Sequence, residues 1–304
     1  MIDSIRLTAA WSWLMGALVA STSIASPQSE SFLNQPVCRN FVRHDDGQIL
    51  LGTNSGLVLI DIDGTSHPYE LGETPRDALI FGNEIIVLVG TKIVTLSRAL
   101  GTVTGQYETQ DIKSAPSLLP QETPRAIGRI DQTLLVAHGT LGVALFDLES
   151  HRLKRIVDIN RGQKIKGMAQ DITAQNHSVY VLVDNYQMDR WHPSQEFRGF
   201  VQIDVDQEAE LARFGGLDPG STAAAWYKNT LLLSFAGMPI WRLAMPLAGV
   251  GPLSDVAHPV TDFGRDGHSV GHLDIDDEFV WTCHRSSNRS TNVPALYPRT
   301  ALGL

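Results

Sequence analysis

Short, nearly continuous apolar runs dominate the pattern of this chain, and turn-forming residues separate them. Six of these runs follow a residue with an acidic or amide side chain: Asp46, Asn83, Asp131, Asn176, Asn229 and Asp277. The runs include residues 85–89 and 179–183, which are rich in β-branched side chains. Such runs are typical of strands that are covered on both faces.

The runs recur as a four-strand unit. A second apolar run, often entered by Gly and closed by Asp, follows the first at residues 56–61, 142–147 and 199–204. A more polar run comes next, as at residues 153–157, and an inner strand such as 76–81 precedes each turn residue. The turn residues are separated by 37, 48, 45, 53 and 48 residues. This period predicts an all-β fold, a β-propeller of about six four-stranded blades, with seven as the alternative count. A two-domain sandwich would not explain the regular unit, and a β-helix would have a shorter period.

Two stretches carry a resemblance to known repeats. Residues 136–139 (VAHG) with 142–147 (GVALFD) resemble the LVIVD and YVTN/YncE-like families of exported bacterial propellers. Residues 46–57 (DGQILLGTNSGL) are similar to the propeller repeat of sensor-kinase ectodomains. The resemblance covers residues 37–283 and implies a propeller fold. Its motifs are degenerate and imply no particular activity.

The sixth repeat is incomplete. Residues 284–290 read as a loop, and only 293–297 could form a further strand. Because propellers commonly close by letting one terminus complete the last blade, residues 27–36 are expected to supply the missing strand. A Cys38–Cys283 disulfide would then join the first and last blades and contribute on the order of 4–5 kcal/mol. Two buried free thiols are the alternative.

The N-terminus reads as a secretory signal. Arg6 precedes an apolar stretch over residues 7–19, and Ser23-Ile24-Ala25 has the small residues of a cleavage site. The apolar stretch is shorter than the roughly 20 residues that a membrane-spanning helix needs, although an uncleaved anchor is the competing interpretation. We therefore expect a signal peptide over 1–25, one propeller domain over 26–304, and a periplasmic or secreted protein that does not span the membrane after cleavage.

The composition is that of an ordinary globular protein, with 43% apolar and 19% charged residues. The formal charge of −9 argues against nucleic acid as a partner, because polyanions repel an acidic surface. A monomer is expected. The nucleophile-elbow, P-loop and dinucleotide-binding motifs are absent from the sequence, so it declares no catalytic chemistry.

One segment has the residue types of a metal site. In an extended strand His268, His272 and Asp274 share one face, and imidazole with carboxylate suits a divalent transition metal. The alternative, that these residues are ordinary loop and strand-entry positions, is the preferred interpretation, and no cofactor is predicted.

Two surfaces are candidate binding sites. Aligning the inner strands places a ring of residues at one mouth of the channel: Arg39, Arg76, Arg125, Gln170, His268 and His272. Guanidinium groups there would suit a carboxylate or phosphate, unless each pairs with an acid such as Glu73, Asp77 or Glu122. The second surface is the long insertion 184–198 in the fourth repeat, whose large side chains are typical of interaction hot spots: Tyr186, Met188, Trp191, His192 and Phe197. These side chains would otherwise fold back onto their own blade.

The leading functional hypothesis is an exported binding or scaffold propeller that engages a protein or a small ligand through one face. The alternative is a propeller enzyme, either a lactonase-like hydrolase or a dehydrogenase-associated subunit, with a metal at the channel mouth.

Overall fold

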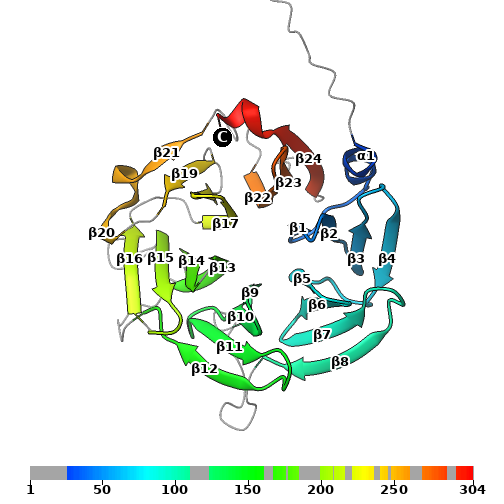
Figure 1. The fold of residues 1–304 in the computed structure, drawn as a ribbon, viewed down its shortest axis with the longest axis horizontal. Coiled ribbons are helices and arrows are strands. Elements are labelled where there is room, and N and C mark those ends of the chain that lie inside the picture. The colour runs from blue at the N-terminus through cyan, green and yellow to red at the C-terminus, as the bar shows by residue number, and fades with distance from the viewer. Residues whose placement is uncertain are drawn as a thin grey trace, which may run out of the picture.

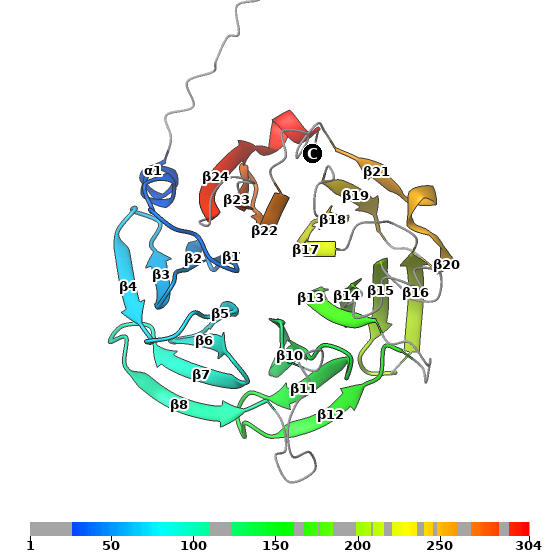
Figure 2. The same cartoon turned by 180° about the vertical axis from the view of Figure 1, so that it is seen from behind.

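Six sheets arranged around a central axis form a six-bladed β-propeller, as the repeat predicts (Figures 1 and 2). The computed structural model describes residues 26–109, 123–160, 167–175, 177–184, 199–207, 209–215, 221–235, 240–245, 248–260, 269–285 and 292–303. The first strand of each blade lies innermost, so β1, β5, β9, β13, β17 and β22 surround the axis (Figure 1).

Blades one to three are four-stranded antiparallel sheets that follow the chain order. Blade one contains β1 (Val42–Asp45), β2 (Gln48–Gly52), β3 (Gly56–Ile60) and β4 (Ser66–Glu70). Blade two contains β5 (Asp77–Phe81), β6 (Glu84–Val89), β7 (Lys92–Ser97) and β8 (Val103–Glu108). Blade three contains β9 (Ala126–Ile130), β10 (Thr133–Ala137), β11 (Val143–Asp147) and β12 (Leu153–Val157).

Blades four to six depart from this regular plan at their outer strands. Blade four contains β13 (Met168–Gln175), β14 (Ser178–Asp184), β15 (Gly199–Asp204), β16 (Ala209–Gly215) and a fifth strand, β20 (Gly249–Pro252), which pairs in parallel with β16. Blade five contains β17 (Ser221–Tyr227), β18 (Thr230–Phe235), β19 (Trp241–Ala244) and β21 (Ala257–Pro259), with the short helix η2 (Leu253–Asp255) between β20 and β21. In the described residues blade six has three strands, β22 (Ser269–Ile275), β23 (Phe279–Arg285) and β24 (Asn292–Pro298), followed by η3 (Arg299–Leu302).

The turn residues of the repeat lie where the sequence places them. Each one that the structure describes sits in the hairpin between the first and second strands of a blade. Asp46 and Asp131 adopt positive φ values of 52° and 48°, a conformation that Asp and Asn tolerate better than most residues. This requirement explains why these side-chain types recur at the turn.

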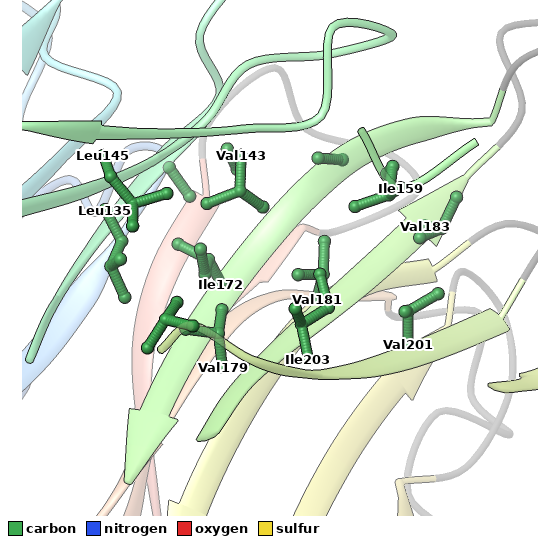
Figure 3. Packing of buried hydrophobic residues seen from close by; sticks show 14 residues of the cluster. Leu135, Val143, Leu145, Ile159, Ile172, Val179, Val181, Val183, Val201 and Ile203 are labelled. Atoms are coloured by element: carbon green, nitrogen blue, oxygen red, sulfur yellow. The ribbon is translucent and has the colours of Figure 1, made fainter. Parts of the chain in front are cut away.

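The blades pack face to face through their apolar side chains. The cluster between blades three and four joins Leu135 and Leu145 of blade three to Ile172, Val181 and Val201 of blade four (Figure 3). These side chains are at most 4% exposed. The continuous apolar runs are explained by this arrangement, because the second and third strands of a blade are covered by neighbours on both faces.

The N-terminal segment closes the ring as a helix, so the expectation of a strand over residues 27–36 was wrong. Helix α1 (Pro27–Leu33) begins at Ser26, whose Oγ accepts the N–H of Ser29, with Pro27 in the first turn. The helix contacts β24 and β3, and its Phe32 ring is fully buried with its centroid 5.1 Å from that of Trp281. Blade one and blade six are therefore joined by side-chain packing where a shared strand was expected.

The predicted cysteine pairing lies at the same junction between blades one and six, which we call the seam. The structure joins Cys38, ahead of β1, to Cys283 of β23, with Cα atoms 5.6 Å apart and a sequence separation of 245. Both cysteines are fully buried in one cluster with Phe32 and Trp281. Across the described residues, no helix has the length and apolar character required to cross a membrane.

Candidate functional site

A charged cluster lies in the central channel, and its centre is Arg43 of β1. The guanidinium donates two hydrogen bonds to the carboxylate of Asp77 of β5, from Nε to Oδ1 at 3.0 Å and from Nη2 to Oδ2 at 2.7 Å. Nη2 also donates to the carbonyl of Ile127 on β9, at 3.2 Å, and lies 3.7 Å from Oδ1 of Asp171 on β13. One side chain therefore connects blade one to blades two, three and four.

Each aspartate of the channel also bridges two neighbouring blades through backbone N–H groups. Asp77 accepts from Ala78 of its own strand and from Ile127 of blade three, at 2.9 and 2.8 Å. Asp171 accepts in the same way from Ile172 and from Ala224 of blade five, at 2.8 and 2.7 Å.

An aspartate that accepts backbone N–H groups from two blades also connects blade six to blade one. Asp274 of β22 accepts from Ile275 and from His44 of blade one, at 2.8 and 2.7 Å. Asp45, at the end of β1, accepts from Ile80 of blade two at 3.0 Å. We call Asp45, Asp77, Asp171 and Asp274 the bridging aspartates. Their first role is structural. Asp77, Asp171 and Asp274 each satisfy backbone donors of two blades, and Asp45 of blade one satisfies a backbone donor of blade two.

Burial shifts the pKa values of the cluster strongly. Burial alone would lower the pKa of Arg43, but Asp77, with smaller contributions from Asp171 and Asp274, outweighs it and raises that pKa above its ordinary value. Burial raises the pKa of Asp171, against the opposing charges of Arg43 and His272. Burial lowers the pKa of His272, which favours the neutral imidazole. Arg43 therefore does not fully offset the cost of burying Asp171 and Asp274 as charged groups, and the pKa of each stays above its ordinary value.

Asp274 should make the free energy of unfolding depend on pH. Burial raises its pKa from 3.8 to about 6, although Arg43, the N–H groups of His44 and Ile275, and the His44 ring all act to lower it. Because the folded state binds this proton more tightly than the unfolded state, the contribution to stability is present below pH 3.8 and is lost as the pH rises through about 6. Lowering the pH from 7 to 5 should therefore increase the free energy of unfolding by about 1 kcal/mol through this group.

The test compares the wild type with Asp274→Asn by urea denaturation at pH 5, 6 and 7. The difference in unfolding free energy between the two proteins should change by about 1 kcal/mol across this range. Groups that do not interact with Asp274 titrate equally in both proteins and cancel in the difference. A difference that stays constant from pH 7 to 5 would show that Asp274 is ionised throughout.

A cavity of about 280 Å³ adjoins the cluster and is lined by all six inner strands. Its polar walls come from Arg43, His44 and Asp45 of β1, Arg129 of β9, Thr173 of β13 and Asp274 of β22. The rest of the lining comes from Leu79, Ile127, Gly128, Ile172, Ala174 and Trp226. Since Asp45, Ala174 and Trp226 lie at or next to the last residues of their strands, the cavity is at the end of the channel where the inner strands finish.

The predicted ring of arginines lies at the opposite end, where the inner strands start. Arg39, Arg76 and Arg125 occupy equivalent positions in their blades, since each donates its backbone N–H to a carbonyl at or next to the end of the second strand, at Gly52, Leu88 and Ala137. The guanidinium of Arg39 is bound to Asn54. Burial and the nearby charge of Arg125 lower the pKa of Arg76. Asp77, one of the acids proposed as a partner for these arginines, is instead bound to Arg43.

The remaining candidates are placed only in part. Gln170 lies in β13, and His272 lies in the channel beside Asp171 and Asp77. His268 and the insertion residues Tyr186, Met188, Trp191, His192 and Phe197 lie outside the described residues. Residues 61–65 form a turn in which Asp63 accepts the N–H of Thr65. Among the described residues, no group of three His, Cys, Asp or Glu side chains is placed to hold a metal ion.

The sequence did not reveal the cavity or the central role of Arg43. A signal was present, however, because Asp77, Asp171 and Asp274 interrupt inner strands that are otherwise mostly apolar and recur in alternate blades. A buried carboxylate at a repeated strand position indicates a satisfied polar network.

Comparison with known proteins assigns no family to the chain. No family model matches the chain, and no curated protein matches it. Among solved structures, BamB from Moraxella catarrhalis is similar, with a TM-score of 0.49 and 14% sequence identity over 84% of this chain and 83% of that chain. A similarity at this level transfers neither a partner nor an activity to this chain.

Proposed function

We propose that this protein is an exported binding propeller that engages a small ligand or a partner protein through the face where the channel cavity lies. The observation that carries the proposal is the cavity itself, which is polar, adjoins the cluster that Arg43 forms with buried aspartates and is lined by every blade. Rigid surroundings suit binding, because the bridging aspartates hold the lining strands in fixed positions at little cost on association.

Export is supported by two features. Residues 1–25 have the sequence of a cleavable secretory signal, and the chain pairs its two cysteines across the ring seam. Disulfides persist in oxidising compartments, so the pairing fits a periplasmic or secreted location. Intact-mass analysis of the purified exported protein tests this part, with a mature N-terminus at Ser26 as the expected result.

The binding proposal is tested by filling the cavity. Thr173 lines it, and Thr173→Trp adds an indole to a space of about 280 Å³. We expect this variant to lose ligands found by a thermal-shift screen of polar metabolites, or partners found by cross-linking at this face, while its thermal midpoint stays near that of the wild type.

The matched control is Thr104→Trp, which places the same indole on the exposed outer strand of blade two. Binding should survive in this control. A ligand or partner that binds the Thr173→Trp variant as well as the wild type would move the binding site elsewhere, with the mouth arginines and the 184–198 insertion as the remaining candidates.

A further inference from the structure

We infer that the channel cavity accepts an organic cation, the ammonium or guanidinium group of a small amine or of a partner's lysine or arginine side chain. This inference deepens the proposed function and rests on it. It is carried by the geometry and the charge of the cavity walls and of the cluster behind them.

The carboxylates of the cavity and its cluster outnumber the cations that serve them. Asp45 and Asp274 line the cavity, and Asp77 and Asp171 adjoin it through Arg43. Arg43 is committed to Asp77 through both Nε and Nη2, and its nearest nitrogen is 3.7 Å from Asp171.

Arg129, the second arginine that lines the cavity, contacts an aromatic ring and a backbone carbonyl. The guanidinium of Arg129 lies over the ring of Phe81, with Cζ 5.2 Å from the centroid, and Nη1 donates to the carbonyl of Asp131. Among the described residues, Asp274 accepts hydrogen bonds only from the backbone N–H groups of Ile275 and His44. A ligand that brings positive charge to this wall therefore meets a carboxylate that no side-chain cation neutralises by direct contact.

The shape and the remaining walls favour a small organic cation. A volume of about 280 Å³ is near the lower end of ligand pockets and suits one long side chain or one small amine. Leu79, Ile127 and Ile172 offer apolar surface for a methylene chain, and Trp226 supplies an indole, the aromatic ring that attracts cations most strongly. The acidic net charge of the whole chain would also favour the approach of a cation.

The inference is tested by calorimetric titration of the full mature protein with matched probes. Cadaverine and agmatine supply free ammonium and guanidinium groups, and N-acetyl-lysine-methylamide represents a side chain of a partner. The neutral probe 1,5-pentanediol and the anion glutarate have similar length. We expect one or more of the cationic probes to bind, and the diol and glutarate to bind at least tenfold more weakly, since a hydrogen bond to a charged group is worth roughly tenfold to a hundredfold in affinity.

Two variants assign the binding to the cavity. Asp274→Asn should weaken binding of the cationic probe by about tenfold or more. Asp45→Asn replaces it if the first variant does not fold. The control Asp131→Asn removes an exposed carboxylate outside the cavity at a positive φ that Asn tolerates, and should leave affinity within about twofold. Binding of the free amines points to a small ligand, and binding of the lysine derivative alone points to a partner's side chain.

The outcomes separate this inference from the proposed function. Equal binding of the diol, binding of glutarate alone, or no binding of any cationic probe would overturn the cation inference. If a neutral or anionic probe binds and Thr173→Trp abolishes that binding, the cavity still binds ligands and only the charge assignment fails. If a cation binds equally to the wild type and to Thr173→Trp, the proposed binding site itself is wrong.

Discussion

Replacing Arg43 with methionine should lower the free energy of unfolding by about 3–5 kcal/mol, the range seen when one partner of a buried ion pair is removed. Arg43 is 14% exposed and Asp77 and Asp171 are at most 1% exposed, so the carboxylates cannot recover their hydration when the guanidinium is lost. Methionine retains an unbranched side chain of similar length, so the change removes mainly the charge and the hydrogen-bond donors. Urea denaturation at pH 7 measures the effect.

Two further variants show whether the loss arises from uncompensated carboxylates. Arg39→Met removes an arginine whose guanidinium contacts the Asn54 side chain at the protein surface, and it should cost less than about 1 kcal/mol. Adding Asp77→Asn to Arg43→Met should recover part of the stability, because one buried charge then disappears. If the free energy of unfolding of Arg43→Met is within about 1 kcal/mol of the wild-type value, the cluster is more hydrated than its burial indicates.

The architecture was predictable from the sequence because local rules determine it. Each blade needs a tight hairpin after its inner strand, and Asp46 and Asp131 meet that need with positive φ values. Each middle strand is covered on both faces, which requires the continuous apolar runs. Both constraints act within a few residues, and their repetition reveals the number of blades.

The channel cluster was not predictable because its contacts depend on the closed ring. Arg43 reaches Asp77 across 34 residues of sequence and Ile127 across 84. In the sequence Asp77 lies next to Arg76, and this proximity suggests a pairing with the mouth arginines that the ring does not make. Only the ring brings β1 close to β5, β9 and β13 at the same time.

The N-terminal helix shows a local signal that was outweighed. Ser26 and Pro27 are a capping residue and a first-turn residue of a helix, yet the segment was assigned to a strand because the last blade lacked one. A helix of seven residues is marginal by itself, so its formation depends on the burial of Phe32 against Trp281. Tertiary packing at the seam therefore determines the local structure.

The contacts that secure the seam between blades one and six include α1, the Asp274 bridge to the His44 N–H, and the disulfide. The covalent contact should have the largest single effect. Cys38 and Cys283 are 245 residues apart, and releasing a loop of that length should lower the free energy of unfolding by about 5 kcal/mol in the chain-entropy model. The double variant Cys38→Ser/Cys283→Ser and the wild type under reducing conditions should show the same loss in urea denaturation.

If the disulfide acts through chain entropy, the cysteine variants should also follow a specific pattern among themselves. Because either substitution breaks the same bond, Cys38→Ser, Cys283→Ser and the double variant should be destabilised equally, whereas independent packing defects would add. The dependence of unfolding free energy on urea should also become steeper, since the unfolded chain without the cross-link exposes more surface. Additive losses with an unchanged urea dependence would mean that the cysteines stabilise the seam by packing and that the helix and the Asp274 bridge are sufficient to close the ring.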